Sequence, residues 1–207
     1  MRIGKLAKAD NGLTLIEVLV TIVILGIITA ALGRAVISYV KYSNATSDRL
    51  AQSHDAQVSA AYFAQDVASF GMRDYTANGT PMVSSIQVNA AYNAGGKTCG
   101  TAATPVALVR FLSDDWDSAS SPPVLGTDVV AYYLSGTALR RMKCVRSTTA
   151  ASDVIVAHYV DPATLSLTCV NGCGAADVPQ VTLAFTVIKP AVAAYPVTLN
   201  GQRRQTA

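Results

Sequence analysis

A long apolar stretch stands near the start of the chain. Residues 13–33 read LTLIEVLVTIVILGIITAALG and contain one charged residue, Glu17. As a helix this stretch would be about 31 Å long, which matches the roughly 30 Å hydrocarbon core of a bilayer. The pattern therefore predicts a membrane-spanning helix.

The helical pattern continues past the apolar stretch. Residues 34–70 contain neither Pro nor Gly, and their apolar positions recur at spacings of three, four and seven. This is the pattern of an amphipathic helix, and we expect it to run to about Met72. Gly71 and the segment TANGTP at 76–81 supply the signals that end it. No strict heptad persists, so a coiled coil is not predicted.

The remainder of the chain is rich in strand formers. The turn dipeptides Ser135-Gly136 and Asn171-Gly172 separate some of these segments and indicate hairpins. We expect an antiparallel sheet packed on the helix, which is an α+β fold with the helix first. The expected strands are residues 84–88, 106–112, 129–134, 138–145, 154–160, 164–170 and 181–188.

These patterns divide the chain into four segments. Residues 1–12 form a basic leader, residues 13–33 a transmembrane helix, and residues 34–75 its amphipathic continuation. Residues 76–207 form a β-rich globular head. A head of this size can build one modest hydrophobic core.

Composition and charge narrow the class of protein. Hydrophobic residues make up 51% of the chain and charged residues 14%, against about 25% charged in ordinary domains, which argues against intrinsic disorder. The net charge of +3 is too small and too scattered to indicate a nucleic-acid partner. Arg2, Lys5 and Lys8 precede the apolar stretch, so the positive-inside rule places the N-terminus in the cytoplasm and the head outside.

Three ordinary interpretations compete for the N-terminal stretch. A secretory signal peptide has an apolar core of about 7–15 residues, shorter than this one, and would be cut after about Ala31. A lipoprotein needs a Cys directly after the apolar run, and none is present. A plain membrane anchor gives no reason for Glu17. Inserting an ionisable group into a bilayer costs about 2.5–3.5 kcal/mol near the centre and less near an edge. Glu17 is therefore a candidate functional residue.

Residues 12–20, GLTLIEVLV, resemble the type III signal of type IV pilins and type II secretion pseudopilins. The resemblance implies that a prepilin peptidase cuts between Gly12 and Leu13 and that Leu13 is then N-methylated. Leu13 stands where the family usually has Phe, and Leu is a tolerated variant. Glu17 becomes the fifth residue of the mature chain, the position of the family's Glu.

The resemblance also implies how the mature chain assembles. Cleavage leaves a charged amine on Leu13, which the family pairs with the Glu of a neighbouring subunit, so Glu17 would set the register between subunits. The alternative is that Glu17 serves only recognition or extraction from the membrane. The implied partners are other pilin or pseudopilin subunits, the prepilin peptidase and methyltransferase, and an assembly platform in the bacterial inner membrane. The chain would start there as a single-pass protein and end in an extracytoplasmic filament.

Several head segments resemble minor subunits of the J type in type II secretion and the W type in type IV pili. This resemblance is looser than that of the leader, and it implies a minor subunit. The segments that carry it are 62–67 (YFAQDV), 109–115 (VRFLSDD), 130–134 (VAYYL), 139–141 (LRR) and 195–204 (YPVTLNGQRR).

The four cysteines are Cys99, Cys144, Cys169 and Cys173. Beyond a membrane segment, an even number of cysteines indicates disulfides in an oxidising compartment. Cys99 could bridge to Cys144, and Cys169 to Cys173, but four cysteines allow three connectivities. A zinc site is the rival interpretation, although its usual signature has two C-x2-C pairs and this chain has one C-x3-C pair.

Two charged clusters have alternative interpretations. Asp114, Asp115 and Asp117 lie beside Trp116 and could bind calcium, or they could belong to a plain surface loop. A basic run could contact DNA or an acidic partner, or it could be the solvent face of a strand. This run consists of Arg140, Arg141, Lys143 and Arg146.

Enzyme motifs do not emerge from the sequence. It contains no G-x-S-x-G, and Gly95-Gly96-Lys97-Thr98 lacks the earlier Gly of a phosphate loop. We therefore expect no catalytic residue, no cofactor and no metal. The sequence predicts a structural subunit, a minor pilin or pseudopilin, and the alternative is a singly anchored extracytoplasmic binding or sensor domain.

Overall fold

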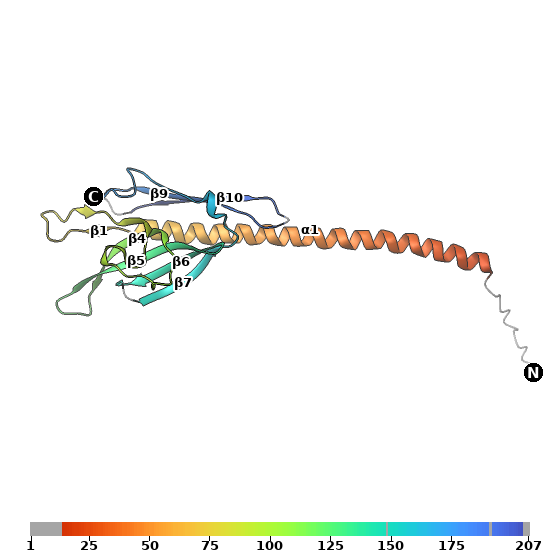
Figure 1. The fold of residues 1–207 in the computed structure, drawn as a ribbon, viewed down its shortest axis with the longest axis horizontal. Coiled ribbons are helices and arrows are strands. Elements are labelled where there is room, and N and C mark those ends of the chain that lie inside the picture. Colours follow the sequence, from red (N-terminus) through yellow and green to blue (C-terminus); the bar gives the residue numbers. More distant parts are fainter. Residues whose placement is uncertain (1–13, 148, 191, 205–207) are drawn as a thin grey trace, which may run out of the picture. The chain divides into compact units, whose positions relative to one another are not determined.

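The computed structural model describes residues 14–147, 149–190 and 192–204 (Figure 1). The chain divides into two compact units, residues 1–47 and residues 48–207. Helix α1 (Leu15–Ser69) begins in the first unit and ends in the second. Antiparallel strands follow it, so the predicted α+β class with the helix first is confirmed.

The strands of the second unit form separate sheets. A five-stranded sheet has the order β3-β4-β5-β6-β7, a three-stranded sheet the order β10-β9-β8, and β1 pairs with β2. The elements are β1 (Met72–Arg73), β2 (Met82–Val83), β3 (Ile86–Ala90), η1 (Ala94–Gly96), β4 (Ala107–Asp117), β5 (Val124–Ser135), β6 (Ala138–Val145), β7 (Thr149–Ala157), η2 (Pro162–Thr164), β8 (Ser166–Cys169), β9 (Gln180–Val187) and β10 (Tyr195–Gln202).

The head thus has two main sheets where the sequence predicted one. The chain leaves β7 through η2, where Asp161 caps the short helix and Pro162 occupies its first turn. Pro cannot donate to a sheet ladder, so the chain turns away and starts the second sheet at β8. Within the second unit, the end of α1 lies between the two sheets (Figure 1).

Helix α1 ends where the chain joins the five-stranded sheet. The backbone of Gly71 has a φ of 149°, a conformation that residues with a side chain rarely adopt. Its N–H donates to the carbonyl of Leu112 in β4 at 2.8 Å. Gly71 therefore directs the chain from the helix onto the edge of this strand.

The main core lies between α1 and the two sheets. Phe63 of the helix packs edge-on against Phe111 of β4 and Tyr132 of β5, with ring centroids 5.8 and 5.6 Å apart. On the other side, Gly201 of β10 lies so close to the helix that a Cβ there would be 2.4 Å from the Cβ of Val67. A glycine is therefore required for this close approach of strand to helix.

A second, smaller core covers the outer face of the five-stranded sheet. It contains the disulfide between Cys99 and Cys144. Arg110 of β4 is fully buried on the same face, and burial lowers the pKa of its guanidinium. Arg110 donates to the carbonyls of Ala91 at 2.9 Å and Ala94 at 3.2 Å, and also to that of Lys97. The Gly95-Gly96-Lys97 segment therefore covers this buried cation.

The second disulfide joins Cys169 and Cys173, so the structure has one of the three connectivities that the sequence left open. The two bridges close loops of very different length, with sequence separations of 45 and 4. Loop-closure entropy makes the longer bridge the more stabilising one.

We expect that replacing Cys99 and Cys144 together with Ala lowers the free energy of unfolding by about 4 kcal/mol, and that the same change at Cys169 and Cys173 lowers it by about 2 kcal/mol. Denaturant unfolding of the full chain in detergent, followed by Trp116 fluorescence, measures both. Equal losses from the two double variants would contradict the assignment of the larger stabilisation to the longer loop.

Candidate assembly site

The predicted processing site lies at the start of the chain. Gly12 and Leu13 are outside the residues that the structure describes. Thr14 is the first described residue, and α1 begins directly after it at Leu15. The geometry of the site is therefore that of Thr14, Glu17 and the helix that follows.

Thr14 and Glu17 form a reciprocal cap on the first turn of α1. The Glu17 N–H donates to the Thr14 hydroxyl at 3.3 Å, and the Thr14 N–H donates to a Glu17 carboxylate oxygen at 3.4 Å. This is a capping box, and the Glu17 N–H also donates to the Thr14 backbone carbonyl at 3.0 Å. The sequence analysis missed the role of Thr14, although the spacing Ser/Thr-x-x-Glu is its signal.

The position of Glu17 also suits its charge. A carboxylate in the first turn lies at the positive end of the helix dipole, which stabilises it by roughly 0.3–1 kcal/mol. Glu17 is exposed, so its carboxylate is accessible to a cation from another molecule. The residue therefore combines a local role in the helix start with an available negative charge.

The helix presents an apolar surface over the predicted membrane segment. Every residue from 14 to 44 is exposed, including large aliphatic side chains such as those of Leu15, Ile22 and Ile27. Within the described part of the chain, α1 is the one helix that is long and apolar enough to cross a membrane. An exposed apolar surface of this extent requires a cover, which is lipid or other apolar helices.

A comparison with known families identifies this segment. Residues 7–33 match the family model described as the prokaryotic N-terminal methylation motif. The start of the chain therefore carries the N-terminal processing motif of type IV pilin-like precursors. Neither the curated proteins nor the solved structures gave a match to it.

The motif and the apolar helix together indicate the general kind of precursor. It is a precursor of the kind that prepilin peptidase processes, and its apolar helix is a single-pass membrane anchor. The family is structural rather than enzymatic, and its members interact with other pilin subunits and with the peptidase.

A buried ionic network attaches α1 to the five-stranded sheet. Arg141 of β6 donates to both carboxylate oxygens of Asp66 at 2.6 Å each. Tyr132 of β5 donates its hydroxyl to the same carboxylate at 2.6 Å, and the Arg141 guanidinium lies 4.8 Å from the ring centroid of Tyr62. The side chains of Asp66, Tyr132 and Arg141 are all buried. The network therefore holds one turn of the helix against two neighbouring strands.

The electrostatics of this network follow from burial and the opposed charges. Burial, together with the adjacent negative charge of Asp66, raises the pKa of Tyr132 well above its ordinary value. Burial alone would lower the pKa of Arg141, but its hydrogen bonds to Asp66 and the charge of that carboxylate raise it on balance. Tyr132 is therefore a neutral donor, and Arg141 is the cation that balances Asp66.

The rest of the basic run has acidic partners within the chain. Arg140 pairs with Asp153 at 3.0 Å, and Lys143 with Asp128 at 3.7 Å. Arg146 contacts Asp115 at 2.9 Å and Asp117 at 2.7 Å. The members of this run therefore belong to ion pairs within the chain.

The acidic cluster belongs to a strand, which differs from the predicted loop. Asp114, Asp115 and Asp117 lie on β4, which extends to Asp117 because it pairs with β5 down to Val124. Asp114 accepts hydrogen bonds from the backbone N–H of Arg73 at 2.9 Å and the hydroxyl of Tyr75 at 3.0 Å. In the described part of the chain, no group of three or more metal-binding side chains is placed to hold an ion.

The second unit contains as many positive as negative charges. Five of the 16 Lys and Arg and two of the 13 acidic residues precede residue 48, so residues 48–207 contain 11 of each. The second unit is therefore formally neutral, and the net charge of the whole chain comes from its first 47 residues.

Polar contacts also bring distant residues to the helix near the start of the second unit. Asp55 accepts hydrogen bonds from both the backbone N–H and the ring Nδ1 of His158, each at 2.9 Å. Asp48 pairs with Lys189 at 2.5 Å. His54 and His158 line the same small cavity, which their separation in the sequence did not predict.

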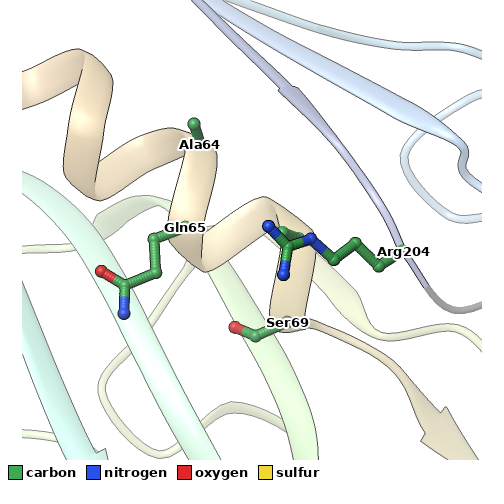
Figure 2. Close-up of a pocket in the computed structure, with 5 residues that line it drawn as sticks. Ala64, Gln65, Ser69 and Arg204 are labelled. Carbon is green, nitrogen blue, oxygen red and sulfur yellow. The ribbon is translucent and has the colours of Figure 1, made fainter.

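A groove of about 650 Å³ lies along the end of α1. Figure 2 shows Ala64, Gln65 and Ser69 on the helix and Arg204 opposite them. The two arginines of the closing segment have different surroundings. The Arg203 guanidinium lies 5.5 Å from the ring centroid of Phe70 and pairs with Asp177 at 2.7 Å, whereas Arg204 lines the groove and donates its backbone N–H to the carbonyl of Ala68.

Proposed function

We propose that the chain is a minor pilin or pseudopilin, a structural subunit of a type IV pilus or a type II secretion pseudopilus. Prepilin peptidase removes residues 1–12, and Leu13 becomes the methylated N-terminus. The mature chain then leaves the inner membrane and joins a filament through α1. Its head is displayed outside the cytoplasm.

One observation carries this proposal. The apolar part of α1 is exposed along its whole length, and its single charge is Glu17 in the first turn. A helix in a membrane or an apolar bundle retains an ionisable group when that group has a partner. The methylated amine of a neighbouring Leu13 is such a partner, because processing creates a positive charge at the end of each helix.

The pairing would act mainly on register. A mispaired subunit would leave a charge without a partner between apolar helices. In that low-dielectric environment an unpaired charge has a large free-energy cost. The filament would therefore have a lower free energy when neighbouring helices are aligned than when one of them is displaced along its axis. The apolar surface supplies the cohesion between subunits, and Glu17 supplies their alignment.

The assignment as a minor subunit rests on the head. The segment 62–67 that resembles minor subunits contains Asp66, the residue that attaches the helix to the sheet through Arg141. The first Pro of the chain is Pro81, and α1 is continuous from Leu15 to Ser69. Helix α1 therefore contains no Pro that would kink it, which supports the assignment as a minor subunit.

N-terminal mass spectrometry tests the proposal directly. The protein is recovered from its native membrane and from the sheared surface fraction, so that its own peptidase has acted on it. We expect a mature chain that begins with methylated Leu13 in both fractions. A chain that begins near Met1 would indicate a plain anchor of a binding or sensor domain, and one that begins near residue 32 would indicate ordinary secretion. Either result would overturn the proposal.

A further inference from the structure

The part of α1 that follows the apolar stretch has an unusual exposed surface. Residues 34–42 read RAVISYVKY, and they all lie on the helix in the first unit. Tyr39 is 74% exposed and Tyr42 76% exposed, and the aliphatic side chains of Val36 and Ile37 are also exposed. Apolar and aromatic surface therefore continues beyond the segment that spans the hydrocarbon core.

The charges of this region have one sign. Arg34 and Lys41 are the only charged residues between Glu17 and Asp48. No acidic side chain in that interval is available to pair with them along the helix. The region thus combines two positive charges with two tyrosines, directly after a membrane-spanning segment.

The dimensions place this region at the membrane surface. At about 1.5 Å per residue, the helix from Leu15 to Gly33 spans about 28 Å, and from Leu15 to Tyr42 about 42 Å. These lengths correspond to the hydrocarbon core and to the full bilayer with its headgroups, roughly 30 Å and 40–45 Å. Helical side chains lean toward the N-terminus, so Tyr39 and Tyr42 lean back toward the bilayer.

The residue types match the chemistry of this layer. Tyrosine is enriched at membrane–water interfaces because its ring is apolar and its hydroxyl remains hydrated. Basic residues near an anionic membrane surface are attracted to the lipid phosphates by roughly 1 kcal/mol each. The surface is also continuous with the membrane-spanning part of the same helix, so lipid is the molecule closest to it in the anchored chain.

We propose that residues 34–42 form a lipid collar, a surface that lies in the headgroup layer on the side of the head and binds anionic phospholipid. Tyr39 and Tyr42 insert between headgroups, and Arg34 and Lys41 contact their phosphates. The collar fixes how deeply the anchored subunit sits, because its tyrosines favour the interface over both the hydrocarbon core and water.

Tryptophan fluorescence in vesicles tests the lipid collar. The background is the full chain carrying Trp116→Phe, which removes its only Trp. The probe variant adds Tyr39→Trp to this background. The control variant adds Gln57→Trp instead, at an exposed position of α1 within the second unit. Each is placed in vesicles of phosphatidylcholine and phosphatidylglycerol, with bromine on the upper acyl chain of one lipid at a time. We expect blue-shifted emission and strong quenching for Tyr39→Trp, and solvent-like emission for Gln57→Trp.

The lipid preference is read from the same samples. At equal bromolipid content, brominated phosphatidylglycerol should quench Tyr39→Trp more than brominated phosphatidylcholine, with an enrichment of up to about fivefold per basic residue. Adding Arg34→Gln and Lys41→Gln should bring the two lipids to equal quenching.

Three results would overturn the lipid collar. Solvent-like emission of Tyr39→Trp would place the residue in water. Equal quenching by the two lipids before the basic residues are changed would remove the anionic preference. Blue-shifted emission without quenching by either lipid would mean that helices of other copies cover the surface. Because each readout uses the anchored precursor, failure of this proposal leaves the assignment as a filament subunit untouched.

Discussion

The Glu17→Gln variant is expected to be processed normally but to be nearly absent from filaments. Gln can replace Glu in a capping box, so the first turn of α1 should remain capped by Thr14. What the variant lacks is the negative charge that would balance the amine of a neighbouring Leu13. An unpaired buried charge costs about 3–5 kcal/mol, so incorporation should fall by more than about a hundredfold. The ratio of chain in the sheared surface fraction to chain in the membrane fraction measures this loss.

The matched control is Thr14→Ala. This variant removes the hydroxyl that caps the Glu17 N–H and retains the carboxylate. Loss of such a cap costs about 0.5–2 kcal/mol of helix stability, so we expect a much smaller reduction in filaments. If Thr14→Ala and Glu17→Gln reduced incorporation equally, the role of Glu17 would be to start the helix and not to pair with a neighbour. Cleavage in both variants is checked by the mass of the N-terminus.

The Asp66→Asn variant is expected to lose much of the stability of the head. It removes the charge that balances Arg141 in a buried site, and breaking a buried ion pair at one partner costs about 3–5 kcal/mol. Tyr132 would also donate to a weaker acceptor than a carboxylate. Since a typical domain has only about 5–15 kcal/mol of stability, the variant should unfold at a much lower denaturant concentration than the parent chain.

Two further variants distinguish charge imbalance from a general loss of contact. Arg140→Gln breaks the more exposed pair with Asp153 and should cost no more than about 1 kcal/mol. Replacing Asp66 by Leu, Arg141 by Met and Tyr132 by Phe together removes both charges and the hydroxyl that donates to Asp66, and it should recover most of the stability that Asp66→Asn loses. Denaturant unfolding of the full chain in detergent measures all three. A triple variant as unstable as Asp66→Asn would contradict the assignment of the loss to an unpaired Arg141.

The helix and most strands could be predicted because their patterns are local. The apolar run and the three-and-four spacing predicted α1 but extended it to about Met72, beyond its end at Ser69. Alternation or apolar runs predicted the strands from β3 to β9. The strand β10 was missed because Pro196 interrupts its pattern. The structure explains why Pro is tolerated there, since β10 is an edge strand and an edge strand can leave a backbone position unpaired.

The features that depend on contacts between distant segments could not be predicted. Asp66 lies on the buried stripe of α1 with Ser59 and Phe63, which could have marked it as a buried carboxylate, but its partner is 75 residues away. Likewise, the pairing of Arg146 with Asp115 and Asp117 arises from sheet register and could not be read from either charged cluster alone. The role of Thr14 is different, because its capping spacing to Glu17 is local and was available in the sequence.

The balance of charge in the second unit has a consequence for the packing of subunits in a filament. A filament holds its subunits at very high local density, and neighbouring subunits with net charges of the same sign would repel one another. With 11 positive and 11 negative residues in 48–207, the second unit adds no net charge to this repulsion. Neighbouring heads can then be packed closely at low ionic strength as well as at high ionic strength, and their choice of neighbour depends on local surface shape and paired charges.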